Sequence, residues 1–209
     1  CIQVCDGQGG CTTATAKIIV TPVNDPPVIT PVTETTPEDT PVEVCLSATD
    51  IESATLTVTV CGGPSNGTIT VAPVYNESTG EVCFTYLPDE NWNGTDEVCI
   101  EVCDAEGACA SAIATIIVTP VNDPPVISPV TETTPEDTPV EVCLSATDIE
   151  RATLTVTVCG GPSNGTITVA PVYNESTGEV CFTYMPSEDW TGTDEVCIEV
   201  CDAEGACAS

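Results

Sequence analysis

The sequence contains no histidine and almost no basic residues. Lys17 and Arg151 stand against 33 acidic residues, which gives a net charge of −31 at pH 7. Because histidine is the commonest general base and metal-ligating side chain, its absence removes the usual acid–base and zinc chemistry. Such a charge disfavours binding to nucleic acid. No apolar run approaches the ~20 residues of a membrane-spanning helix, so we expect neither nucleic acid nor a membrane span.

The sequence also lacks an initiator methionine and a recognisable signal peptide. Cys1 falls in the middle of a pattern typical of a β-strand, so we expect the 209 residues to be a segment of a longer protein. The hydrophobic content of 41% distinguishes the chain from a disordered acidic tail. A folded chain with this charge would repel itself unless cations neutralise part of it.

Fifteen cysteines are present, but they lack the paired CxxC spacing of zinc sites. Disulfide bonds in an oxidising, extracellular or cell-surface setting are therefore expected.

The cysteines reveal an internal repeat of 98 residues. Cys1, Cys5 and Cys11 recur as Cys99, Cys103 and Cys109, and again as Cys197, Cys201 and Cys207. The predicted division is residues 1–21, the last two strands of a preceding repeat, residues 22–119, a complete repeat, and residues 120–209, a second repeat that lacks most of its final strand.

Each repeat is predicted to be all-β. Alternating runs rich in valine, isoleucine and threonine are separated by turns rich in glycine, proline, asparagine and aspartate, and no segment has helical periodicity. Seven strands in about 98 residues are typical of an antiparallel Greek-key sandwich of the cadherin or Ig-like kind, here arranged in tandem, end to end. The expected strands of the complete repeat are residues 28–33, 42–48, 54–61, 67–71, 81–86, 96–103 and 111–118.

Strand alternation places all the cysteines of a repeat on the outer faces of the sandwich. This excludes the buried bridge between sheets that antibody domains contain, so disulfides must join neighbouring strands of one sheet. The expected pairs are Cys45–Cys83, Cys61–Cys99, Cys103–Cys109, Cys143–Cys181, Cys159–Cys197, Cys201–Cys207 and Cys5–Cys11.

Acidic side chains collect in the turns at both ends of each predicted sandwich. Asp50, Glu52 and Asp104 lie where the chain enters the first complete repeat, and Glu38 with Asp89 and Glu90 lie where it leaves. A hard divalent cation would relieve their repulsion, and Ca²⁺ accepts six to eight oxygen ligands, whereas Mg²⁺ prefers fewer protein ligands. We therefore expect Ca²⁺ as the cofactor.

The linker sequence VNDPP and the acidic motifs PED, ATDIE, LPDE and VCDAEG resemble those of cadherins. The order of motifs from Tyr86 to Pro125, in which Gly-Thr-Asp follows a Tyr and a Pro and precedes VNDPP, resembles still more closely the cadherin-like, Ig-like tandem repeats of large bacterial and archaeal surface proteins. The resemblance implies Ca²⁺ between successive repeats of an extended, surface-attached protein. It implies as metal ligands Asn24, Asp25, Asp50, Glu52 and Asp104 at the first junction, and Glu38, Asp89, Glu90, Asn122, Asp123, Asp148, Glu150 and Asp202 at the second.

The sequence thus predicts a non-enzymatic structural repeat of an extracellular fibre or giant cell-surface protein, with neighbouring repeats or copies of itself as partners. Two alternatives remain: an adhesin that binds carbohydrate or another cell, and a subunit that polymerises by strand donation. Glycans are a further expected partner, because five sequons for N-glycosylation occur. These sequons are Asn66, Asn76, Asn93, Asn164 and Asn174.

Overall fold

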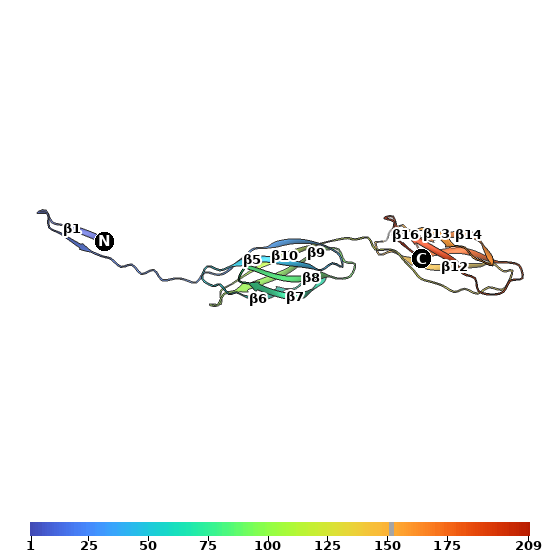
Figure 1. The fold of residues 1–209 in the computed structure, drawn as a ribbon, viewed down its shortest axis with the longest axis horizontal. Helices are drawn as coiled ribbons and strands as arrows, with labels where there is room; N and C mark the ends of the chain where they lie inside the picture. The colour runs from blue at the N-terminus through green and yellow to red at the C-terminus, as the bar shows by residue number, and fades with distance from the viewer. Residues whose placement is uncertain (151–152) are drawn as a thin grey trace. The chain divides into compact units, whose positions relative to one another are not determined.

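The computed structural model describes residues 1–150 and 153–209, and these contain only strands, turns and irregular segments. Within them no helix is long and apolar enough to cross a lipid bilayer. The chain divides into two compact units, Cys1–Val118 and Thr119–Ser209. Each unit contains a sandwich of antiparallel strands (Figure 1), so the all-β, Ig-like fold expected from the sequence is confirmed.

The first sandwich has two four-stranded sheets, ordered β3-β5-β8-β7 and β4-β10-β9-β6. Its strands are β3 (Val28–Ile29), β4 (Val32–Pro37), β5 (Val42–Thr49), β6 (Thr57–Gly62), β7 (Gly67–Asn76), β8 (Glu81–Pro88), β9 (Gly94–Cys103) and β10 (Cys109–Thr119).

The opening strand differs from the expected single strand at residues 28–33. It is divided into β3, which pairs with β5, and β4, which joins the other sheet beside β10. Pro31 lies between the two segments and has no N–H to donate, so the ladder is interrupted there. β7 also runs further than expected, to Asn76, as an edge strand with two shifts of register.

The core of the first sandwich follows the predicted alternation. Val44 and Leu46 on β5, Phe84 on β8 and Ile100 on β9 are buried, and β10 adds Ile116. Alternation along β6 from the buried Leu56 would place Val60 on the inner face, but Val60 is 41% exposed. β6 is the edge of its sheet and its pairing with β9 shifts between Val60 and Gly62, so the inner face is open at that point.

The second sandwich repeats this plan with a shorter second sheet. Its sheets are ordered β11-β12-β15-β14 and β13-β16-β17. The strands are β11 (Val126–Ile127), β12 (Val140–Thr147), β13 (Thr155–Gly160), β14 (Gly165–Asn174), β15 (Glu179–Pro186), β16 (Cys197–Cys201) and β17 (Cys207–Ala208).

At the N-terminus, β1 (Ile2–Cys5) and β2 (Cys11–Ala14) form a separate two-stranded hairpin. It repeats the register of β9 with β10, since Cys5 faces Cys11 as Cys103 faces Cys109.

Seven disulfides staple neighbouring strands of single sheets, and they join the pairs expected from alternation. Three of them close hairpins: Cys5–Cys11, Cys103–Cys109 and Cys201–Cys207. The other four span 38 residues each: Cys45–Cys83, Cys61–Cys99, Cys143–Cys181 and Cys159–Cys197. Cys1 is the one free cysteine among the described residues.

The two kinds of disulfide are expected to differ in their stabilising effect. In the chain-entropy account, a loop with ends 38 residues apart contributes about 4 kcal/mol and one with ends 6 residues apart about 2 kcal/mol. The double variant Cys45→Ser/Cys83→Ser should therefore lower the melting temperature of the first sandwich more than Cys103→Ser/Cys109→Ser does. Scanning calorimetry of the full chain measures both, and an equal or reversed order would contradict the loop-length account.

Candidate metal site

The linker before each sandwich is fixed to its own repeat by a proline and an asparagine. Pro27 and Pro125 are buried, whereas the prolines before them are exposed. The Asn24 side-chain amide donates a hydrogen bond to Oδ2 of Asp104 at 2.8 Å, and the Asn122 amide does the same to Asp202 at 2.7 Å. Proline also stiffens the linker in an extended form. The linker therefore lies against the entry end of the repeat that follows it, meaning the end at which the chain enters the sandwich.

Asp104 holds both the linker and the turn between β9 and β10. Its Oδ1 accepts the Ala108 N–H at 2.8 Å while Oδ2 accepts the Asn24 amide. The hydrogen bond from Asn24, together with the backbone N–H groups of the turn, keeps the pKa of Asp104 below its ordinary value despite burial. Asp202 has the same arrangement and a lowered pKa from the same causes.

Asp50 presents one carboxylate oxygen that the sandwich leaves without a hydrogen bond. Its Oδ1 accepts the N–H groups of Glu52 at 2.9 Å and Ser53 at 2.6 Å, which fixes the turn after β5. Its Oδ2 is buried and has no hydrogen-bond partner. A buried polar oxygen without a partner carries a desolvation cost that a bound cation would remove.

The linker backbone lies beside the turn that contains Glu52. The Asp25 N–H lies 3.4 Å from Oε2 of Glu52, so the linker backbone approaches the carboxylate. In the second repeat, Oδ2 of Asp123 is also buried without a hydrogen-bond partner. The predicted entry-end residues of each repeat are thus brought together by the fold.

At the entry end of the second repeat, the raised pKa of Glu150 indicates burial together with accumulated negative charge. Partial burial raises the pKa of Glu150, and repulsion from the carboxylates of Asp148 and Asp123 adds to the increase. The donor set is composed of carboxylate and amide oxygens, which suit Ca²⁺ and not a soft metal. The residues present, with the partnerless oxygen of Asp50 among them, therefore fit a calcium ion.

The predicted exit-end ligands lie at the opposite end of the first sandwich. β5 separates the two sets, because Glu38 precedes its first residue and Asp50 follows its last. Glu38 is buried, whereas Asp89 and Glu90 are exposed in the turn after β8. Asp39 ties these two loops together, since its Oδ1 accepts the Asn91 N–H at 2.9 Å.

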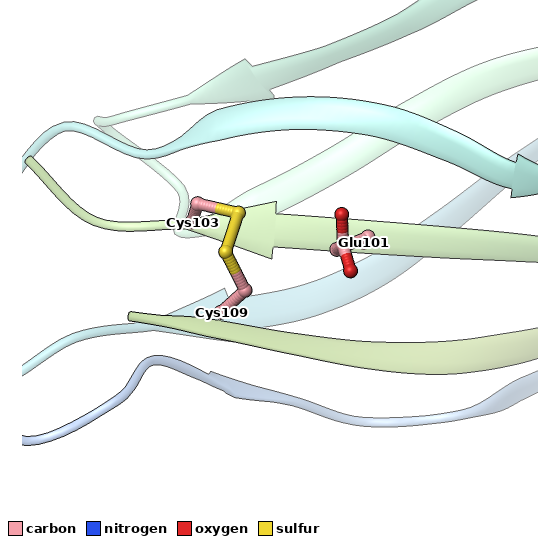
Figure 2. Close-up of side chains that lie close together, drawn as sticks. All are labelled: Glu101, Cys103 and Cys109. Carbon is pink, nitrogen blue, oxygen red and sulfur yellow. A yellow bond between two sulfur atoms is a disulfide. The ribbon is translucent and has the colours of Figure 1, made fainter. Parts of the chain in front are cut away.

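Two further groups combine glutamate with cysteine and do not form metal sites. Figure 2 shows Glu101 beside Cys103 and Cys109, whose sulfur atoms are joined. Glu141 lies beside the bonded pair Cys143 and Cys181 in the same way. A thiolate is needed to bind a metal, so both groups are structural.

Asp96 is an important residue to which the sequence analysis assigned no role. It is 4% exposed, and its carboxylate accepts the N–H groups of Ser65, Asn66 and Glu97 and the hydroxyl of Tyr86. Burial alone would raise the pKa of Asp96, but these donors lower it below the ordinary value. The Gly-Thr-Asp motif at residues 94–96 was visible in the sequence, but only the fold brings the distant donors to it.

The five sequons divide into two groups by their surroundings. Asn66 and Asn164 are half-buried, and their backbone groups take part in the network around Asp96 and its counterpart Asp194. Asn76, Asn93 and Asn174 are exposed. Three of the predicted glycosylation positions are therefore accessible to a modifying enzyme.

Comparison with known families identifies the repeats. The family model described as "Bacterial Ig domain" matches residues 24–117 and again residues 122–209, so the chain belongs to this family, in two tandem copies. No curated protein sequence matches the chain significantly. The disulfides and the family together suggest an extracellular protein.

Among solved structures, cadherin domains resemble the chain in fold. Protocadherin gamma B7 domains 1–4 match with a TM-score of 0.52 and 17% identity, over 88% of this chain and 47% of that one. The protocadherin gamma B4 extracellular domain gives a TM-score of 0.52 and 17% identity, over 91% of this chain and 32% of that one. An endo-fucoidan hydrolase of glycoside hydrolase family 107 matches less well, with a TM-score of 0.41 and 18% identity over 97% of this chain and 31% of its own. The chain spans less than half the length of all three, and the likeness shows the fold alone.

The Asp96 network predicts an acid-dependent contribution to stability. Because its pKa is lowered on folding, the ionised carboxylate stabilises the native state above about pH 4, and this contribution is lost as the pH falls further. Asp96→Asn should lower the unfolding free energy by about 2 kcal/mol or more at pH 7, because an amide nitrogen cannot accept the N–H groups.

The difference between wild type and Asp96→Asn should shrink as the pH is lowered below about 4. Urea unfolding at a series of pH values measures it, with Glu97→Gln, an exposed neighbour on β9, as the control. A difference that is constant with pH would refute the assignment to the ionised carboxylate.

Proposed function

We propose that the chain is a structural segment of an extracellular fibre or large cell-surface protein whose repeats are made rigid by Ca²⁺ at their entry ends. The observation that carries the proposal is the buried Oδ2 of Asp50, which has no hydrogen-bond partner and belongs to a turn of carboxylates. Asp123 in the second repeat presents an oxygen of the same kind.

The ion would be held by the entry-end residues of one repeat. In the first repeat these are Asn24, Asp25, Asp50, Glu52 and Asp104, and in the second Asn122, Asp123, Asp148, Glu150 and Asp202. Bound Ca²⁺ supplies positive charge, which offsets the repulsion among these carboxylates. Asp104 and Asp202 act mainly as anchors, because hydrogen bonds to the linker amide and to the turn already engage their oxygens.

The remaining ligands of the proposed site are assigned from the order of residues along the chain. Glu38, Asp89 and Glu90 belong to the repeat that precedes the linker Asn122–Asp123, and they complete the oxygen set that the cadherin-like pattern implies. A cation shared in this way would restrict the motion of one repeat against the next.

The covalent chemistry supports a durable extracellular role. Seven disulfides join strands within sheets, which constrains the unfolded state. Lys17 and Arg151 are the only lysine and arginine, so trypsin-like proteases find few cleavage sites. Both properties suit a protein whose function is mechanical.

Calcium should raise the melting temperature of the full chain. A ligand that binds only the native state at about 100 times its Kd stabilises it by about 2.7 kcal/mol, which corresponds to a rise of about 10 °C for a domain of this size. Scanning calorimetry in excess Ca²⁺ and in EDTA measures the difference, and titration calorimetry gives the stoichiometry.

The double variant Asp50→Asn/Asp148→Asn should lose most of this rise while melting in EDTA no earlier than wild type. Asparagine at position 50 keeps the Oδ1 that accepts the N–H groups of the turn, and each substitution removes a repelling charge. The matched control is Glu43→Gln/Glu141→Gln, which removes two exposed charges near the start of β5 and β12, away from the entry ends. Identical melting of the wild type in Ca²⁺ and EDTA would overturn the proposal.

A further inference from the structure

The tripeptide Glu-Val-Cys supplies at least one cysteine of every disulfide in the two sandwiches. It occurs eight times in the sequence. In the first sandwich, the valine between each glutamate and its cysteine is 0% exposed. Because side chains alternate along a strand, each of these glutamates shares the outer face of the sandwich with its cysteine. They are Glu43, Glu81, Glu97 and Glu101.

The Glu101 side chain lies directly beside a disulfide on this outer face. Figure 2 shows its carboxylate next to the bonded sulfur atoms of Cys103 and Cys109. One carboxylate oxygen and the two sulfurs all lie within 4.8 Å of one another. The Thr59 hydroxyl on β6 donates a hydrogen bond to Oε2 of Glu101 at 3.4 Å, which helps to hold the carboxylate in place. Negative charge is therefore kept close to both sulfur atoms.

A disulfide of the other sandwich has the same neighbour. A carboxylate oxygen of Glu141 on β12 and the sulfurs of Cys143 and Cys181 also lie within 4.8 Å of one another. This disulfide joins β12 to β15, which correspond to β5 and β8 of the first sandwich and not to β9 and β10. The arrangement therefore follows from the tripeptide and not from one particular strand pair.

The N-terminal hairpin lacks the glutamate. Gln3 occupies the position that corresponds to Glu101, and Cys5 faces Cys11 in the register seen between β9 and β10. An amide has nearly the shape of a carboxylate but no charge. The chain thus contains one disulfide of the same kind without the charged neighbour.

Reduction of a disulfide begins with the attack of an external thiolate. Cys109 is exposed and Cys103 is half-buried, so the thiolate reaches the Cys109 sulfur first. A bond between the two sulfurs forms as the Cys103–Cys109 bond breaks, and the electron pair leaves on the Cys103 sulfur, which takes a proton from water. A second external thiolate then attacks the mixed disulfide. It releases Cys109 as a thiol, and the two external thiols are oxidised to a disulfide.

The carboxylate of Glu101 repels the thiolate at the point of attack. A thiolate that bonds to the Cys109 sulfur comes within about 5 Å of this carboxylate, where the repulsion between two unit charges in water slows a reaction about threefold. Glutathione and similar thiols carry carboxylates of their own, which increases the repulsion.

We propose that the glutamate of each Glu-Val-Cys tripeptide protects its disulfide against reduction by anionic thiols. The protection is kinetic, because the charge slows the first attack. The net charge of −31 acts in the same direction over a longer range. Protected disulfides keep the strands stapled where free thiols are present. This role is separate from the proposed calcium site, since the outer-face glutamates are different residues from the entry-end ligands.

Reduction rates measured for each disulfide test the proposal. The full chain in EDTA is treated under native conditions with mercaptopropionate, whose second group is a carboxylate, or with cysteamine, whose second group is an ammonium. Alkylation and peptide mass spectrometry give the rate at each disulfide. Glu101→Gln should raise the rate at Cys103–Cys109 about threefold with mercaptopropionate and less with cysteamine, whose ammonium offsets the repulsion. High salt should reduce the effect of the substitution.

Glu97→Gln is the matched control. Glu97 lies on the same face of β9 but about 20 Å along the strand from Cys103, so its loss should leave the rate at Cys103–Cys109 unchanged. Glu101→Gln could also open the strand pair, but opening would accelerate both thiols equally. Equal acceleration by the two thiols, or no acceleration, would overturn the proposal.

Gln3→Glu provides the converse test. A carboxylate added beside Cys5 should slow the reduction of Cys5–Cys11 by mercaptopropionate about threefold, while the other disulfides in the same sample keep their rates. An unchanged rate at Cys5–Cys11 would contradict the electrostatic origin of the protection. Because calcium is absent from these reactions, neither outcome bears on the calcium proposal.

Discussion

Closure of each sandwich by its last strand is the interaction on which the remaining structure depends. β10 bonds to β9 along ten residue pairs and is flanked by β4 on its other edge. With β10 in place, Val44, Leu46 and Tyr86 are fully buried. In the second repeat the sequence includes only the first residues of this strand, and the counterparts of these three residues are half-buried. One strand therefore controls both the burial of the core and the protection of the sheet edges on either side of it.

The acidic residues depend on this framework and divide into two roles. Asp96, Asp104 and Asp202 are buried and satisfied by N–H, amide and hydroxyl donors, which hold loops and linkers in place. Asp50 and Asp123 have a buried oxygen without such a donor. Hydrogen bonding thus separates structural carboxylates from candidate ligands, a distinction that residue type alone cannot make.

Much of the fold was predictable because its signals are local. The period of two in the strands assigned the faces, and the faces together with strand order gave all seven disulfide pairs. The splitting of the opening strand at Pro31 and the exposure of Val60 were missed, because they depend on which sheet edge is open. The role of Asp96 was missed because its donors Ser65 and Asn66 lie about 30 residues away.

The sequence by itself determined the repeat, the strand pattern, the disulfide partners and the oxygen-only character of the candidate site. These follow from periodicity, spacing and side-chain chemistry, which need no knowledge of distant contacts. Only the tertiary structure decided which carboxylates are satisfied by hydrogen bonds and which oxygen of Asp50 stays without a partner. Such features arise when strands far apart in sequence pack together, since burial and hydrogen bonding are properties of the assembled layers.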